Sequence, residues 1–149
     1  QGAQGFIDKA LSLKKDYVVA YQLRAQIAYN TKDYKEAISQ LTQAIVLNPQ
    51  VADLYVSRGM LETQTGSHAD ASSDFRTAFS ISPNQNVGYL LAQSDIKSGN
   101  FDEAASLIDT LMKLNPNNGD LKDLKDKLQQ SKNPAPIAQP VVETKKVDN

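Results

Sequence analysis

Apolar side chains recur three or four positions apart along most of the chain, which is the spacing of one face of an α-helix. Three proline-containing pairs interrupt this pattern, each where a helical segment ends: Asn48-Pro49, Ser82-Pro83 and Asn115-Pro116. The two intervals between these prolines differ by a single position. A nearly fixed period of this length, which is about 34 residues, predicts a repeat protein built from helix-turn-helix units.

The middle unit shows how the residues of one repeat produce two helices. Its first helix carries these residues at helical spacing: Leu54, Tyr55, Arg58, Gly59 and Glu62. Gly66 follows, where the end of a helix requires a left-handed backbone. We expect the hydroxyl of Ser67 to cap the second helix and Pro83 to end it. The small residues Gly59 and Ala71 allow the two backbones to approach closely. Helices this short are marginal alone, so each unit needs neighbours.

This pattern resembles the tetratricopeptide repeat (TPR), in which aromatic and small residues recur in fixed order before a closing proline. The first full unit matches at Tyr21, Ala25, Tyr34, Ala37, Leu41, Ala44 and Pro49. The second matches at Tyr55, Gly59, Gly66, Ala71, Phe75, Ala78 and Pro83. The third is shorter and looser, with Leu91, Ala92, Gly99, Phe101, Ala104, Ile108, Leu111 and Pro116. The resemblance implies an all-α, right-handed α-solenoid.

The repeat pattern divides the chain into six segments. Residues 1–15 read as the second helix of a truncated preceding repeat, because their apolar stripe has no first helix before it. The full repeats are expected at 16–49, 50–83 and 84–116, a capping helix at 117–132, and a Pro-rich extended or disordered tail at 133–149. Because the chain starts with Gln1 and half a repeat, we expect a fragment of a longer protein, of bacterial origin.

Composition narrows the classes of function. The chain lacks cysteine, which excludes disulfides, thiolate zinc sites and a cysteine nucleophile. Sixteen basic and seventeen acidic residues give a formal charge of −1, so neither nucleic acid nor an anionic membrane is an expected partner. No apolar run reaches the roughly 20 residues of a membrane span. We expect a soluble segment, cytoplasmic or in the cell envelope depending on what precedes it.

Candidate catalytic chemistry is sparse. His68 is the only histidine, and at the start of a second helix it reads as a partly buried ring. The sequence contains no Gly-rich phosphate loop, nucleophile elbow or metal-spaced cluster. We therefore expect a protein that is not an enzyme and binds no cofactor or metal.

Two arginines, Arg24 and Arg58, occupy the same phase of successive repeats. The facing helix carries Asp74 sixteen residues after Arg58, so we expect a structural ion pair between them, which Glu62 could join. In the first repeat the equivalent of Asp74 is Gln40, a neutral acceptor for Arg24. The alternative is that the arginines grip an anionic ligand.

The resemblance also implies a concave face, lined by the first helices of successive repeats, where related proteins bind peptide segments. The residues at the inward phase are Val19, Gln22, Gln26, Tyr29, Asn30, Asp53, Val56, Met60, Thr63, Gln64, Tyr89, Gln93, Ile96 and Lys97. Family members that hold chaperone C-terminal tails carry Lys, Asn and Arg here, and this chain has mainly amide and apolar groups. We expect a neutral, extended ligand. The alternative is that these side chains bind no ligand and only form the water-exposed surface of a domain that serves as a spacer.

The sequence thus predicts a non-catalytic protein-protein interaction scaffold that binds a largely neutral segment of another protein. The alternative function is a C-terminal regulatory or substrate-presenting appendage of a larger enzyme, such as envelope-polymer or glycosyl transfer machinery. Two further occupants are considered. The chain's own tail could lie on a repeat surface, because proline preorganises an extended segment. A second copy could bind where the first helix lacks cover, at Phe6, Ile7, Leu11 and Leu13.

Overall fold

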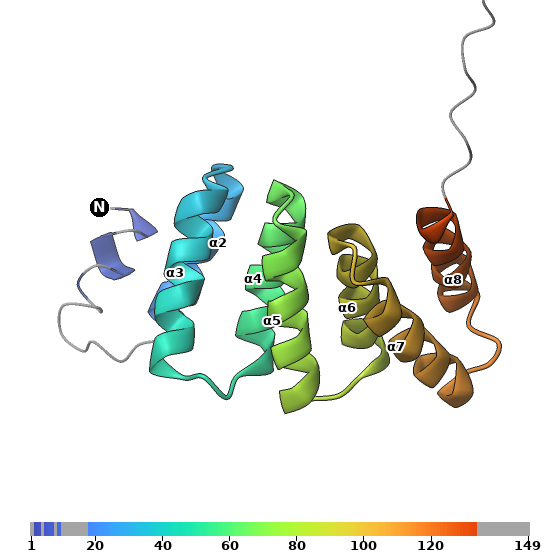
Figure 1. Cartoon of the computed structure of the whole chain (residues 1–149). Coiled ribbons are helices and arrows are strands. Elements are labelled where there is room, and N and C mark those ends of the chain that lie inside the picture. Colours follow the sequence, from blue (N-terminus) through green and yellow to red (C-terminus); the bar gives the residue numbers. More distant parts are fainter. Residues whose placement is uncertain (1, 4, 8, 10–17, 134–149) are drawn as a thin grey trace, which may run out of the picture.

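The computed structural model describes residues 2, 3, 5–7, 9 and 18–133. Within 18–133 it contains α2 (Val18–Asn30), α3 (Tyr34–Leu47), α4 (Ala52–Thr65), α5 (His68–Ile81), α6 (Gln85–Ser98), α7 (Phe101–Leu114) and α8 (Gly119–Lys132). No strand occurs among these residues. Figure 1 shows the pairs α2/α3, α4/α5 and α6/α7 following one another in chain order, with α8 beyond α7. Each helix packs chiefly against its neighbours in sequence, and the expected α-solenoid is confirmed.

The turns inside the repeats end the first helices with left-handed residues. Gly66 has φ of 85° and Gly99 has φ of 87°, which glycine adopts without a steric penalty. The N–H of Ser67 then donates to the carbonyl of Glu62 at 2.8 Å, which closes the last turn of α4. In the first repeat the equivalent residue is Lys32, with φ of 62°. A residue with a Cβ atom has a steric penalty in this left-handed conformation. The three turns therefore share one backbone geometry although their residue types differ.

Side-chain caps fix the start of several helices. The carboxylate of Asp33 accepts from the N–H of Glu36 at 3.1 Å, and Asn84 and Asn118 cap α6 and α8 in the same way. Ser67 is the N-cap residue of α5, but its side chain makes no capping bond, so that expectation was wrong. The backbone of Ser67 resembles that of Asp33 and that of Asn100, the N-cap residue of α7, and Asn100 likewise makes no capping bond, so this backbone does not by itself produce a side-chain cap.

The core consists of small residues where helices cross and large residues between the crossings. The fully buried alanines are Ala37, Ala44, Ala71, Ala78, Ala92 and Ala104. A Cβ placed on Gly59 would lie 2.9 Å from Cε1 of the buried Phe75 ring, and one on Gly88 would lie 3.0 Å from Leu111. The first and second helices of these repeats therefore approach each other so closely that only glycine, which has no side chain, fits at the contact.

Helix α8 covers the last repeat with one apolar stripe. Leu121, Leu124 and Leu128 are buried, whereas most of the remaining α8 side chains are exposed. Two lysines also bond to exposed carboxylates of α7: Lys125 to Asp109 at 2.8 Å and Lys132 to Asp102 at 2.9 Å. These hydrogen bonds lower the pKa of both aspartates. Exposed pairs of this kind contribute little, so the leucine stripe is what holds α8 in place.

The segment before α2 agrees only partly with the expected uncovered helix. Residues 3, 5–7 and 9 have helical backbone, and the Phe6 side chain is 70% exposed. Ile7 is buried, contrary to the expectation that it lacks cover. Leu11 and Leu13 lie outside the described residues, as does the tail after Asn133.

Replacing Gly59 with alanine should destabilise the fold, because the new methyl group would collide with a ring that is already fully buried. We expect Gly59→Ala to lower the free energy of unfolding by about 1–3 kcal/mol, measured by urea denaturation followed by circular dichroism. Gly119→Ala is the matched control, because nothing lies within 4 Å of its new Cβ at the start of α8. This control should be neutral or stabilising. Equal effects of the two substitutions would refute the steric explanation.

Candidate functional site

A cavity of about 330 Å³ lies between the first helices of the first two repeats. Helix α2 contributes Gln22, Ala25, Gln26 and Tyr29, helix α3 contributes Leu41, and helix α4 contributes Ser57, Met60, Leu61 and Gln64. Three lining residues, Ala25, Leu41 and Leu61, are buried, whereas Met60 is 57% exposed. None of the lining residues is charged. We name this site the α2–α4 cavity.

Amide and phenol groups at the edge of the α2–α4 cavity are held by hydrogen bonds. The side-chain amide of Gln26 donates to Oδ1 of Asn30 at 3.1 Å. The amide of Gln64 donates to the hydroxyl of Tyr34 at 2.9 Å, and the Tyr34 ring lies 5.9 Å from the Tyr29 ring. Each glutamine thus uses one of its two N–H groups, and its carbonyl oxygen remains an acceptor. The cavity offers apolar contact together with neutral donors and acceptors.

The structure distributes the sequence-predicted groove residues among several places. Gln22, Gln26, Tyr29, Met60 and Gln64 surround the α2–α4 cavity, with Asn30 beside it. Gln93, Ile96 and Lys97 line a second cavity, between α6 and α8, and Tyr89 lines a third, at the start of α8. Val56 packs against the core around Phe75, and Thr63 bonds through its hydroxyl to the carbonyl of Gly59. Val19 and Asp53 are exposed and line none of these cavities.

Sequence reasoning missed Ser57, which lines the α2–α4 cavity. The sequence-based prediction assumed that the same repeat positions line the groove on every first helix. A cavity between two helices is lined instead by the edge of each helix that faces the other. On α4 that edge is Ser57, Met60, Leu61 and Gln64, one residue later than the equivalent edge of α2. The spacing of three, four and seven residues is itself a helical signal that could have identified this edge.

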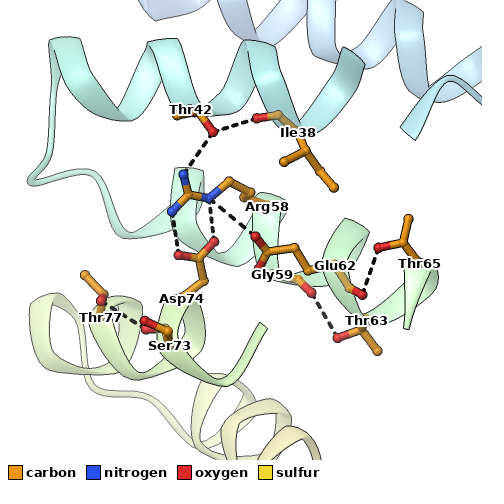
Figure 2. A network of polar contacts seen from close by, with 10 residues as sticks. All are labelled: Ile38, Thr42, Arg58, Gly59, Glu62, Thr63, Thr65, Ser73, Asp74 and Thr77. Carbon is orange, nitrogen blue, oxygen red and sulfur yellow. Dashed lines mark hydrogen bonds and ion pairs between the residues drawn. The ribbon is translucent and has the colours of Figure 1, made fainter. Parts of the chain in front are cut away.

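The predicted pair between Arg58 and Asp74 is present and belongs to a larger network (Figure 2). Nε and Nη2 of Arg58 donate to the two carboxylate oxygens of Asp74, each at 2.7 Å. Nη1 donates to the hydroxyl of Thr42 at 3.0 Å, and Glu62 lies 3.9 Å from Nε. The bonds to Asp74 raise the pKa of the Arg58 guanidinium. Arg58 therefore connects α4 to α5 of its own repeat and to α3 of the preceding one.

The first repeat does not reproduce this arrangement. Gln40 stands where Asp74 stands in the second repeat, and its amide donates to Glu36 at 2.7 Å. Its amide oxygen is buried and accepts no hydrogen bond, so Gln40 is not the acceptor for Arg24 that the sequence led us to expect. An amide on this side of the helix turns toward its own i−4 neighbour, because that glutamate lies within reach.

Comparison with known proteins identifies the architecture. Two sequence models described as tetratricopeptide repeat match residues 18–51 and 63–128. The chain belongs to the tetratricopeptide-repeat family. Both matched segments contain lining residues of the α2–α4 cavity.

Curated relatives are much longer than this TPR chain. It is 30% identical over 104 residues to the Protein STIP1 homolog of Dictyostelium discoideum, covering 69% of this chain and 18% of the relative. It is 31% identical over 121 residues to serine/threonine-protein phosphatase 5 of Rattus norvegicus, covering 80% of this chain and 23% of the relative. The chain thus spans about a fifth of the length of these two proteins.

A solved structure shares the fold at low sequence identity. The first TPR of Spaghetti (RPAP3), bound to the HSP90 peptide SRMEEVD, superposes with a TM-score of 0.65 at 18% identity. The match covers 76% of this chain and 91% of that domain. At this identity the likeness shows the fold alone.

Metal-binding clusters and membrane-spanning helices are absent from the part of the chain that the structure describes. No group of three histidine or acidic side chains there could hold a metal ion. The His68 ring is half-buried, and its Nδ1 atom has no hydrogen-bond partner. None of the described helices is long and apolar enough to cross a membrane.

A second polar network joins the second TPR to the third. Asp95 of α6 is 1% exposed, and its carboxylate accepts from the hydroxyl of Ser72 and, at 3.1 Å, from Nη2 of Arg76. Asn100 adds a longer contact at 3.4 Å. The sequence comparison of repeats did not find this network, because these residues have different types at the equivalent positions of the other repeats.

Glu62 is the one carboxylate of the Arg58 network that lacks close partners. Its side chain is 11% exposed, and its Oε2 atom has no hydrogen bond. Burial raises the pKa of Glu62 to about 7, repulsion from Asp74 and Asp70 adds to this effect, and attraction to Arg58 opposes it. Arg58 is already engaged by Asp74, so Glu62 takes up a proton near neutral pH.

The raised pKa of Glu62 predicts a loss of stability as pH rises. Between the unfolded pKa near 4.5 and the folded pKa of about 7, the folded state binds more protons than the unfolded state, so unfolding becomes easier with increasing pH. Glu62→Gln should remove this decline and be about 1–2 kcal/mol more stable than wild type at pH 8. Denaturation measured at pH 5 and pH 8 would test this. The control Glu103→Gln, at an exposed carboxylate, should retain the decline, and a flat wild-type profile would contradict the prediction.

Proposed function

We propose that this chain is a non-catalytic interaction scaffold whose α2–α4 cavity binds an extended, largely neutral segment of another protein. The observation that carries the proposal is the lining of this cavity, which combines a buried apolar floor with glutamines and contains no charge. Extended segments present alternating side chains and unpaired backbone amides, and both need partners. Apolar side chains fit against Met60 and Tyr29, and the glutamine amides bond the backbone.

The comparison with RPAP3 supports peptide binding, whereas the lining of the α2–α4 cavity favours a different ligand for this chain. The peptide in that structure, SRMEEVD, ends in acidic residues. Family members that bind such tails use lysine, arginine and asparagine, whereas the α2–α4 cavity is lined by neither lysine nor arginine. An acidic tail placed there would lose hydration without gaining an opposite charge. A neutral segment avoids this cost.

The alternative function is that of a regulatory or substrate-presenting appendage of a larger enzyme, of which envelope-polymer or glycosyl transfer machinery is one example. Its support is the relationship to serine/threonine-protein phosphatase 5, which is named as an enzyme and of which this chain spans 23%. Any further domains of the natural protein would distinguish the two functions. Further repeats favour the scaffold, and a catalytic domain or membrane spans favour the appendage.

Two occupants of the cavity compete with a foreign segment: the chain's own tail at 133–149 and a second copy. If the tail occupies the cavity, deleting residues 133–149 raises the affinity for an added peptide. Unchanged affinity after the deletion removes the tail as an occupant. Light scattering at high concentration that reports only monomer removes the second copy.

New charge in the α2–α4 cavity should weaken binding, because a carboxylate beside an apolar ligand must be desolvated without a partner. We expect the double variant Gln26→Glu/Met60→Glu to weaken by about tenfold or more the binding of a dodecapeptide selected on the wild-type protein from a random phage-displayed library. Affinities are measured by isothermal titration calorimetry with the synthetic peptide.

The matched control is Gln43→Glu/Ser73→Glu, which adds the same charge at exposed positions of the second helices α3 and α5. It should bind within about twofold of wild type. Equal losses in both double variants would show a general charge effect, and equal retention would place binding outside the α2–α4 cavity. Either result would refute the proposal.

A further inference from the structure

A second cavity, of about 510 Å³, lies between α6 and α8. Its lining residues are Gln93, Ile96, Lys97, Leu124, Lys127, Gln130 and Ser131. Lys97 and Lys127 come from different helices, and no acidic residue lines the cavity. We name this site the α6–α8 cavity. It combines two cationic groups with amides, a hydroxyl and an apolar floor.

The repeat register places the α6–α8 cavity on the same face as the α2–α4 cavity. Gln93 and Lys97 follow Met60 and Gln64 by one repeat length, which is the offset between the starts of α4 and α6. Lys127 follows Gln93 by one repeat length as well, and α8 begins at the same offset after α6. The two cavities are therefore equivalent sites two helix positions apart along one groove, and Figure 1 shows α4 and α6 between α2 and α8.

The two lysines of the α6–α8 cavity lack ionic partners among the described residues. The ion pairs of α8 are those of Lys125 and Lys132, and both reach carboxylates of α7. No ion pair of Lys97 or Lys127 with a described carboxylate occurs. Two ammonium groups at one cavity repel each other and attract an anion. The chemistry thus fits a carboxylate ligand carried by a partly apolar chain.

We propose that the α6–α8 cavity binds an acidic side chain of the same segment whose apolar part occupies the α2–α4 cavity. This inference rests on the proposed function and adds a charge requirement to it. The groove is neutral at one end and cationic at the other, so it selects segments that are asymmetric in charge. Lysines on two separate helices allow a carboxylate to accept hydrogen bonds from both.

The distance between the cavities sets the spacing of the two features in the ligand. Packed helices lie roughly 8–10 Å apart, and the first helices of successive repeats are no closer than this because each packs chiefly against its neighbours in sequence, so two helix positions correspond to roughly 20 Å or slightly more. An extended chain rises about 3.3 Å per residue. The acidic residue should therefore stand about six residues from the apolar one.

The test is selection from a random phage-displayed dodecapeptide library on four immobilised proteins. They are the wild type, the reversal variant Lys97→Glu/Lys127→Glu, the cavity variant Gln26→Glu/Met60→Glu, and the control Lys113→Glu/Lys122→Glu. The control makes the same charge change at exposed lysines that line neither cavity. Circular dichroism establishes that all four proteins are folded before selection.

The wild type should enrich peptides with an apolar residue and an acidic residue about six positions apart. The reversal variant should keep the apolar preference and lose the acidic one, or exchange it for lysine or arginine. The control should select as the wild type does. Replacing the acidic residue of a selected synthetic peptide by its amide should weaken binding about tenfold to the wild type and less than about twofold to the reversal variant.

Each other outcome has a distinct meaning. Apolar peptides without acidic enrichment, or acidic enrichment that persists in the reversal variant, overturn the proposal and leave the proposed function intact. No enriched peptides on the wild type, or peptides that still bind the cavity variant, overturn the proposed function itself. If amidation of the free C-terminus weakens binding and the side-chain replacement does not, the carboxylate is terminal and the side-chain assignment is wrong. If inorganic phosphate displaces the peptides from the α6–α8 cavity and no peptide sequence is preferred there, the proposal is also overturned.

Discussion

Alanine and glycine at the helix crossings set the distance at which neighbouring helices of this chain meet, and the rest of the structure depends on that distance. Helices of 13 or 14 residues are marginal alone in water, so each is stable only against its neighbours. Gly59 accepts the Phe75 ring where a Cβ would collide with it, and Ala71 and Ala78 are wholly buried nearby along α5. Each first helix packs on one side against the second helix of its repeat. The opposite edges of α2 and α4 then face each other and line the α2–α4 cavity.

Polar networks then make each junction between two repeats different from the other. At the junction of the first and second repeats the arginine is on the first helix α4, where Arg58 reaches Thr42 of the preceding repeat. At the next junction the arginine is on the second helix α5, where Arg76 reaches Asp95 of the following repeat. Thr42 and Arg76 occupy equivalent positions of successive repeats. The two junctions are therefore not interchangeable, because exchanging their repeats would leave a buried Asp95 carboxylate without its partners.

Differences between equivalent positions of the repeats also make the two cavities chemically different. Met60 and Gln64 in the second repeat become Gln93 and Lys97 in the third, at the same positions of two helices of 14 residues. The repeated fold supplies equivalent cavities between α2 and α4 and between α6 and α8, and the side chains that line each cavity decide what it attracts. A ligand that spans several repeats meets a sequence of environments, so its orientation along the groove can be specified without any change in the fold.

The sequence alone determined the helical period, the order of the helices and the Arg58–Asp74 pair, because these depend on spacing along a helix. It also determined that Gln26, Met60 and Gln64 share one broad face. Only the tertiary structure decided that Ser57 lines the α2–α4 cavity, that Lys127 of the capping helix lines one cavity with Lys97, and that Glu62 is left without close partners. Periodicity identifies the faces of a single helix. Which edges of two helices face each other depends on how they pack, and that arrangement is a property of the assembled repeats.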